Sequence, residues 1–317
     1  MESKKAVLAA FAANLSIAGA KFGGFLVTGS SSLLSESVHS LADSANQILL
    51  LVGNKHADTK PTRAHPFGKN GARYVYGFLV AIIIFTVGGM FSVYEGVHKI
   101  QHPEPLQHVW IAYLVLLFAI LAEGFALRTA LNATRKARKG RGFFHFIRRS
   151  RNPEYPVLLI EDSGALLGLT IAIIAITLTV LTGNGVYDGI GSVLIGILLI
   201  SAAIMLAAET GSLLIGESAV PEECDQIATL LVDGQTITSL IHLRTLHVGP
   251  DVLLVTAKVG VPTGTTIEQI VVAVNAAEAR IRTILPKAKY IFVEPDLARV
   301  GDIPKHPQMF PHDPGDE

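Results

Sequence analysis

A group of side chains that can bind a cation lies between two apolar runs near the N-terminus. The stretch SESVHSLADSANQ follows IAGAKFGGFLVTG and precedes ILLLVG, and it holds Glu36, His39 and Asp43. On a helix, this spacing places the three side chains on one face, with His39 and Asp43 one turn apart. An imidazole and carboxylates on one face can hold a divalent cation or exchange protons with it.

A second pair of acids interrupts another apolar run. Glu161 and Asp162 are adjacent, so their side chains are rotated by about 100° on a helix and cannot point the same way. Carboxylates in hydrocarbon usually face the interior of a bundle or a water-filled cavity. We therefore predict that Asp162 completes a metal site with His39 and Asp43.

Other roles for these residues stay open. Glu36 and Glu161 are each predicted as a further ligand, a proton relay or a helix-packing partner. The alternative for the whole group is structural: His39 would hydrogen-bond to a neighbouring helix, and Asp43 would pair with Lys21.

The composition places this site in a membrane. The chain has 317 residues, 50% hydrophobic and 16% charged, with a mean hydropathy of +0.46, whereas a soluble domain has about 25% charged residues. Cys224 is the sole cysteine, which excludes an intrachain disulfide and a cysteine-rich metal site. The N-terminal MESKK enters its apolar segment without a small-residue cleavage site, so we interpret the segment as a retained helix; an uncleaved signal anchor has the same pattern.

Six segments have the length and apolar character of a transmembrane helix. The second and fifth are weakened by the acids described above, and the alternative for such a segment is a buried helix of a soluble core. The segments are Ala6–Thr28, Leu33–Gly53, Tyr74–Val97, Val109–Leu131, Val157–Thr182 and Ile190–Ala208.

Lys and Arg are distributed unevenly between the loops. They gather at residues 54–73 and 135–151, whereas the alternate loops, TGSSS, HKIQHPEPLQH and TGNGVYD, hold only Lys99. Because Lys and Arg accumulate on the cytoplasmic side, both termini are predicted to be cytoplasmic. The basic run between two membrane helices favours contact with anionic lipid over nucleic acid.

The sequence after the last apolar segment predicts a small cytoplasmic α+β domain. SLIHLRTLHVG and DVLLVTAKVGV have the pattern of two strands, KYIFVEP that of a third, and TIEQIVVAVNAAEARIRTIL that of an amphipathic helix capped by Thr265 or Thr266. The predicted domains are a transport domain at 1–208, an α+β domain at 209–303 and a disordered, proline-rich tail at 304–317.

Several motifs together resemble the cation diffusion facilitator family. GSSSLLSESVHSLADSANQ is similar to its second-helix signature, HPFGKNGARY to its His-Pro-x-Gly segment, and YDGIGSVLIGILL to its sixth helix. Within the family, LLIEDSGALLG and LIGES look most like the branch that contains zinc transporter 9. The resemblance covers nearly the whole chain and implies the cation-efflux fold, with six transmembrane helices.

The resemblance also implies a transport site with one pair of ligands on the second helix and one on the fifth. His39 and Asp43 match the first pair and Asp162 matches half of the second, but its expected partner is replaced by Leu158. Water, Glu161 or Glu36 would then complete the site. A site richer in oxygen suits Mn(II) better than a His-rich site does, although one His and two carboxylates still suit Zn(II).

The remaining histidines and acids are predicted to have other roles. His65 is expected to be structural, the outer-loop histidines solvated, and Glu95 and Glu123 engaged in helix–helix hydrogen bonds. His242 and His247 are the candidate metal ligands left in the C-terminal domain, which the resemblance implies is a dimerisation domain.

We expect a homodimeric, multi-pass exporter of a divalent cation, Zn(II) first, in exchange for protons and without a bound cofactor, in a bacterial-type plasma membrane. The alternatives are an Mn(II), Fe(II) or Co(II) exporter and a non-transporting scaffold or regulator, which only Leu158 favours. An enzyme is not expected, because the sequence has no nucleophile-and-base constellation and its GKNG segment lacks the spacing of a phosphate-binding loop.

Overall fold

The computed structural model describes residues 2–57, 60–138 and 154–297. The chain divides into two compact units. Unit 1 comprises Met1–Ala57 and Ala72–Gly211, and unit 2 comprises Asp58–Gly71 and Ser212–Glu317. The predicted disordered tail at 304–317 lies outside the described residues. So does most of the predicted basic run at 135–151.

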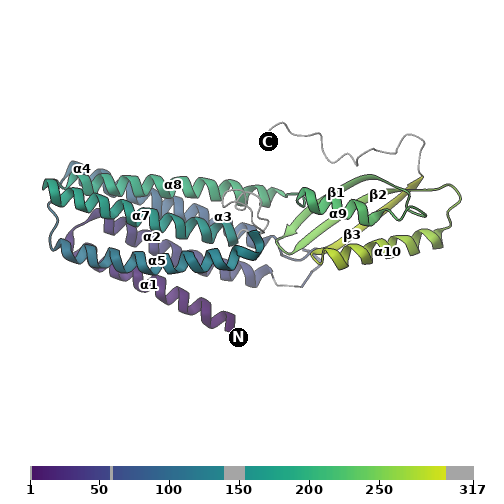
Figure 1. Cartoon of the computed structure of the whole chain (residues 1–317), viewed down its shortest axis with the longest axis horizontal. Helices are drawn as coiled ribbons and strands as arrows, with labels where there is room; N and C mark the ends of the chain where they lie inside the picture. Colours follow the sequence, from purple (N-terminus) through teal and green to yellow (C-terminus); the bar gives the residue numbers. More distant parts are fainter. Residues whose placement is uncertain (1, 58–59, 139–153, 298–317) are drawn as a thin grey trace. The chain divides into compact units, whose positions relative to one another are not determined.

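Unit 1 is built of long helices that run alongside one another (Figure 1). Five of the six predicted segments are single helices, and each helix extends a few residues beyond the apolar run that predicted it. The third predicted segment is divided into α3, a π-helical stretch η1, and α4. The elements are α1 (Glu2–Thr28), α2 (Ser31–Ala57), α3 (Ala72–Ile83), η1 (Ile84–Met90), α4 (Phe91–Gln101), α5 (Val109–Arg138), α7 (Glu154–Thr182) and α8 (Val186–Ile215).

Five candidate membrane spans are present in the part of the chain that the structure describes. They lie in α1, in the continuous run from α3 to α4, and in α5, α7 and α8. The other predicted span, α2, has 27 residues, but its polar side chains keep it out of this set. These helices share one apolar core, which includes Leu33 of α2 with Val80, Leu116, Leu169 and Ile195 of its neighbours. The predicted helical membrane fold with a small C-terminal sheet domain is confirmed.

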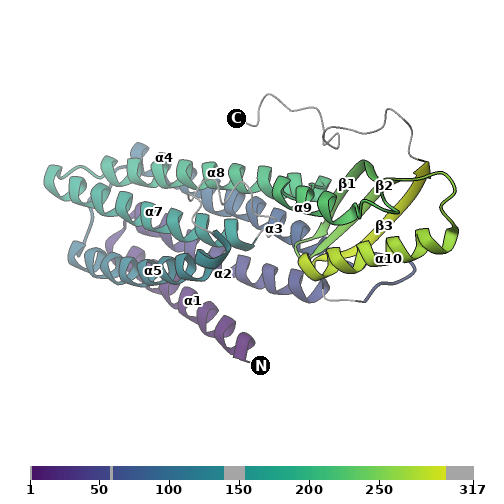
Figure 2. The ribbon, with the colours of Figure 1, turned by 45° about the vertical axis from the view of Figure 1, so that its right-hand side comes forward.

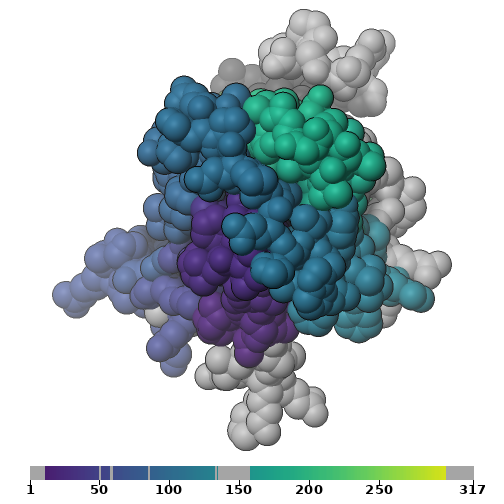
Figure 3. All heavy atoms as spheres, turned by 90° about the vertical axis from the view of Figure 1, so that its left-hand side faces the viewer, coloured from purple at the N-terminus to yellow at the C-terminus, as the bar shows by residue number. Residues whose placement is uncertain are grey.

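Three connections between helices gather at one end of unit 1. Gly29 has a φ of +70° and Gly183 a φ of +68°, so both turns use the left-handed conformation that glycine adopts without strain. Figure 3 looks onto this end and shows the α1–α2 connection (purple) against the α4–α5 connection (blue). The N–H of Gln107 donates to the carbonyl of Thr28 at 3.0 Å, and Lys99 Nζ donates to the carbonyl of Gly29 at 2.9 Å.

The backbones of α8 and of the η1–α4 segment lie in direct contact. A Cβ atom on Gly96 would lie 2.6 Å from the carbonyl oxygen of Gly189, and one on Gly196 would lie 2.8 Å from that of Gly89. Such distances leave no room for a larger side chain. Glycines at these positions therefore let the two antiparallel helices pack closely, as small residues do in membranes.

Unit 2 contains a three-stranded sheet with two helices. Its elements are α9 (Pro221–Leu231), β1 (Ser239–Gly249), β2 (Val252–Val261), α10 (Ile267–Ile284) and β3 (Ala288–Leu297). The strand order is β1-β2-β3, with β1 and β2 antiparallel and β2 and β3 parallel. A parallel pair needs a crossover, which α10 provides by lying across the sheet (Figure 2).

Residues at their predicted positions explain the elements of unit 2. Thr266 caps α10 by accepting a hydrogen bond from the N–H of Gln269, whose side chain accepts one from Thr266 in return. Alternate β2 residues, among them Val255 and Val259, are buried against Ile281 of α10 and the apolar residues of α9. The three predicted strands and the amphipathic helix are therefore confirmed.

The connection between α2 and α3 belongs to unit 2. The ring of Phe67 packs edge-on against that of Tyr290 in β3, with 5.0 Å between the ring centroids. Gly249, at the end of β1, lies so close to Asn70 that a Cβ atom there would overlap the Asn70 side chain. The predicted boundary at residues 208 and 209 had placed this connection with the helices instead.

Candidate cation site

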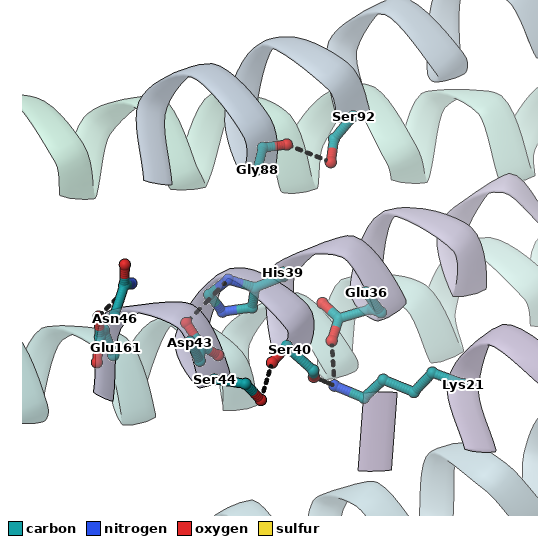
Figure 4. A network of polar contacts seen from close by, with 10 residues as sticks. All are labelled: Lys21, Glu36, His39, Ser40, Asp43, Ser44, Asn46, Gly88, Ser92 and Glu161. Carbon is teal, nitrogen blue, oxygen red and sulfur yellow. Dashed lines mark hydrogen bonds and ion pairs between the residues drawn. The ribbon is translucent and has the colours of Figure 1, made fainter. Parts of the chain in front are cut away.

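Helix α2 carries a row of buried polar side chains in the interior of unit 1 (Figure 4). Among them, Glu36 is held by a lysine of α1: Lys21 Nζ lies 2.9 Å from Glu36 Oε2 and donates to Ser40 Oγ at 2.8 Å. Lys21 and Glu36 are both fully buried. The structure therefore pairs Lys21 with Glu36, and not with Asp43 as the structural alternative supposed.

His39 and Asp43 lie next to each other one turn further along α2. They are 2% and 7% exposed, and His39 Nδ1 is 3.6 Å from Asp43 Oδ1. That distance is too long for a hydrogen bond. Among the described residues, neither ring nitrogen of His39 nor Oδ1 of Asp43 has a hydrogen-bond partner. Buried polar atoms normally have one, so these atoms are free to receive a ligand or water.

The acids of α7 approach the same part of α2. Asn46 Nδ2 donates to Glu161 Oε1 at 2.8 Å. Asp162 is close enough to Asp43 to act on it electrostatically, and its Oδ2 has no hydrogen-bond partner among the residues described. Leu158 is 39% exposed.

The structure brings the predicted ligands together only in part. His39 and Asp43 are adjacent, and Asp162 lies within electrostatic range of Asp43. No three His, Cys, Asp or Glu side chains within the described ranges are close enough together to hold a metal ion. Of the two further candidates, Glu36 is occupied by Lys21 and Glu161 by Asn46.

The N-terminal turn of α2 contains a polar contact that the sequence analysis missed. Asp188, at the start of α8, is fully buried and accepts hydrogen bonds from the hydroxyls of Ser30 and Ser31 at 2.8 and 3.1 Å. It also accepts from the N–H groups of Ser31 and Ser32 at 2.7 and 3.3 Å. A carboxylate is well placed at the N-terminus of a helix, where N–H groups lack partners. The available signal was an acid at the start of one apolar helix and three serines at the start of another.

Glu123 is a second residue that the sequence analysis left without a site. It is 7% exposed, and its charge acts on Asp43, Glu161 and Asp162. Its inward direction follows from the spacing of Leu116 and Ala119, which are also buried on α5.

The other histidines considered as candidates have surroundings of their own. His65 is exposed and forms a backbone turn with Thr62, and its N–H donates to the Thr62 carbonyl at 3.1 Å. His98 and His102 have ring centroids 4.9 Å apart near the end of α4. In unit 2, His242 is exposed, and His247 is buried with its backbone N–H donating to the Glu217 carbonyl.

Apolar helices around an interior group of imidazole and carboxylate side chains define an integral multi-pass membrane protein equipped to receive a cation. Residues 7–215 match the family model of the cation efflux transmembrane domain, so the chain belongs to the cation efflux family.

Three relatives illustrate its place within that family. The chain is 35% identical over 231 residues to the human "Proton-coupled zinc antiporter SLC30A9, mitochondrial" and 30% identical over 250 residues to "Metal tolerance protein C4" of Arabidopsis thaliana. These matches cover 72% and 78% of the chain, but 41% and 55% of the two relatives. A match to "Zinc transporter ZitB" of Pectobacterium atrosepticum has 26% identity over 208 residues, 66% of the chain and 60% of that protein. The predicted resemblance to the zinc transporter 9 branch is confirmed.

Proposed function

We propose that this protein exports a divalent cation, Zn(II) first, in exchange for protons. The observation that carries the proposal is the set of buried, unpartnered atoms on His39, Asp43 and Asp162 inside a cation efflux domain. The names of the relatives, which include a proton-coupled zinc antiporter, support zinc as the first candidate.

In the proposed cycle, His39, Asp43 and Asp162 bind the cation. Zn(II) takes nitrogen and oxygen ligands at about 2.0–2.2 Å. Because the side chains lie further apart than a bound ion requires, binding draws α2 and α7 together, and release lets them separate. A change of helix spacing on binding is what alternating access requires.

Protons compete with the cation for the same atoms. An imidazole or carboxylate must be deprotonated to bind metal, so loading releases protons and protonation releases metal. A proton gradient across the membrane would then drive the cation outward. No resident cofactor is needed, because the metal is the cargo.

The rival functions have specific support of their own. Mn(II), Fe(II) or Co(II) is favoured by the oxygen-rich composition of the site, because Leu158 stands where a further ligand was expected. A scaffold without transport is favoured by the separation of the side chains. The family and its named relatives are transporters, and this disfavours both a scaffold and an enzyme.

The orientation and assembly are part of the proposal. The charge of the loops favours a cytoplasmic position for both termini. We propose a bacterial-type plasma membrane, although the human relative is named as mitochondrial. Two chains would pair, at least in part through unit 2, whose Val272 and Phe292 are 68% and 56% exposed.

Transport into proteoliposomes tests the function. We expect Zn(II) flux that depends on an imposed pH gradient in the wild type and falls to the level of empty liposomes in Asp43→Asn and Asp162→Asn. Mn(II), assayed side by side, identifies the preferred cargo by its rate. Glu95→Gln is a matched control, because Glu95 is an acid of α4 outside the group.

Each contrary outcome has a separate meaning. Flux that survives both substitutions would place the pathway elsewhere. A folded wild type that moves neither ion would favour the scaffold.

A further inference from the structure

One buried carboxylate of unit 1 is not used by the function proposed above. Glu123 lies in α5, whose outward side chains Leu121 and Phe125 are 66% and 74% exposed. Glu123 is 7% exposed, on the opposite side of the helix. None of the hydrogen bonds or ion pairs found between described residues involves it. A carboxylate in the interior of an apolar helix bundle is costly, so its position calls for a compensating charge or proton.

Contacts between α5 and α7 set the height of Glu123 in the bundle. The hydroxyl groups of Tyr113 and Thr177 are 2.9 Å apart, and Ala130 packs with Leu159 in one apolar cluster. The helices are therefore antiparallel, and Glu123 lies about one turn from the predicted ligand of α7.

Contacts between α2 and α7 show which residues of α2 lie at the height of Glu123. The Asn46–Glu161 hydrogen bond marks one limit. The other limit is Gly168, where a Cβ atom would overlap Oε1 of Glu36. Glu123 falls between these limits, at the height of the two predicted ligands of α2. Three helices thus present ligand-type side chains at one level of the bundle.

The distances between these side chains agree with that placement. Glu123 lies within electrostatic range of His39, Asp43 and Asp162. The lysine nearest to them, Lys21, is already held by an ion pair with another carboxylate and by a serine. The group therefore has an excess of acids, which a divalent cation would balance.

We propose that Glu123 is a further ligand of the transported cation and supplies from α5 the carboxylate that position 158 lacks. The inference rests on the function proposed above and extends it, because the site then spans three helices. Leu158 is 39% exposed, whereas Glu123 is 7% exposed and lies at the height of His39 and Asp43. One imidazole and three carboxylates make an oxygen-rich set that accepts Zn(II) and Mn(II).

Metal binding to the purified full-length chain tests this role without relying on transport. Zn(II) and Mn(II) affinities would be measured by competition with a chromophoric chelator for the wild type, Glu123→Gln, Glu123→His, Asp43→Asn and the control Glu95→Gln. Glu123→Gln should weaken Zn(II) binding at least about tenfold, the lower end of what even an outer-shell change costs. It should have no comparable further effect in an Asp43→Asn background.

Glu123→His sharpens the test, because it keeps a ligand and changes its type. An added imidazole should raise the preference for Zn(II) over Mn(II), which a merely structural role would leave unchanged. Wild-type Zn(II) affinity in Glu123→Gln, with binding lost in Asp43→Asn, would overturn this inference and leave the proposed function standing. Wild-type affinity in Asp43→Asn as well would overturn the proposed function itself.

Discussion

Two buried stretches of α2, its first turns at residues 31–35 and the turns that carry His39 and Asp43, treat their polar side chains differently. In the first turns, Ser30 and Ser31 donate to Asp188, and Ser35 and Ser192 share a hydrogen bond of 2.5 Å. In the later turns, His39 and Asp43 lie side by side with atoms that no described residue satisfies. Glu36 lies between these two stretches. Its Oε2 accepts a hydrogen bond from Lys21, and its Oε1 has no hydrogen-bond partner among the described residues.

The difference separates a structural polar contact from a functional one. A buried polar group that is fully hydrogen-bonded fixes helices in place, whereas an unsatisfied group is costly and needs a reason to be retained. The serine-rich first turns of α2 therefore anchor the helix to α8. The turns that carry His39 and Asp43 keep their ligand atoms available at a cost in stability.

Breaking the ion pair between Lys21 and Glu36 should have the largest effect on stability. Lys21→Met leaves the carboxylate of Glu36 buried without a counter-charge, which typically costs about 3–5 kcal/mol. The midpoint of thermal unfolding in detergent should fall strongly. The double variant Lys21→Met/Glu36→Gln removes both charges and should regain most of the loss. A double variant no more stable than the single one would show that the pair itself is not responsible.

Removing the charge of Asp188, which connects α8 to the start of α2, should have the next largest effect on stability. Asp188→Asn weakens several hydrogen bonds to one carboxylate, each of which contributes about 1.5–3 kcal/mol when charged. The unfolding midpoint should fall, whereas Asp43→Asn should leave it unchanged or raise it. An equal fall of the unfolding midpoint in the two variants would show that the first turns of α2 and the turns around His39 and Asp43 do not differ in this way.

An exposed carboxylate in unit 2 provides the smallest effect and a comparison with Asp188. Asp233 accepts hydrogen bonds from the N–H groups of Gln235, Thr236 and Ile237 at 2.8–2.9 Å. Partial burial alone would raise its pKa, but these donors and the charge of Arg280 hold the pKa below its usual value of 3.8. Because solvent screens this site, Asp233→Asn should cost less than about 1 kcal/mol.

The pH dependence of that cost has a definite sign. A depressed pKa in the folded state gives stability that is present above the usual value and lost as pH falls through the folded pKa. Wild type and Asp233→Asn should therefore differ most near neutral pH and converge once the pH has fallen below the folded pKa of Asp233, in denaturant unfolding followed across pH. A difference that grows on acidification would contradict the prediction. A cost as large as that of Asp188→Asn would show that the number of donors, and not burial, sets the contribution.

Local patterns in the sequence predicted most of the fold. The alternation in β1 and β2, the cap at Thr266 and the face shared by His39 and Asp43 are all set within a few residues. Features that depend on the register between helices were missed. The Lys21–Glu36 pair, the hydrogen bonds of Asp188 and the height of Glu123 beside the ligands of α2 need contacts between distant segments, which periodicity alone does not specify.

The π-helical stretch and the loop between α2 and α3 were missed for related reasons. Ile84–Met90 has an apolar sequence that suits a regular α-helix equally well, and its altered winding accompanies the close packing of Gly89 against α8. The loop is polar and glycine-containing, as exposed connections are, and only the tertiary structure shows that Phe67 packs against Tyr290.

Because Phe67 and Asn70 pack against strands near the far end of the chain, unit 2 cannot be removed or exchanged as one contiguous piece. A truncation after Gly211 would leave this loop behind with the aromatic ring that β3 covers exposed to solvent. A chimera that receives unit 2 from a relative would likewise join a foreign surface to the native loop. Both the loop and the C-terminal segment need to be taken together, so two separated stretches of the gene encode one module.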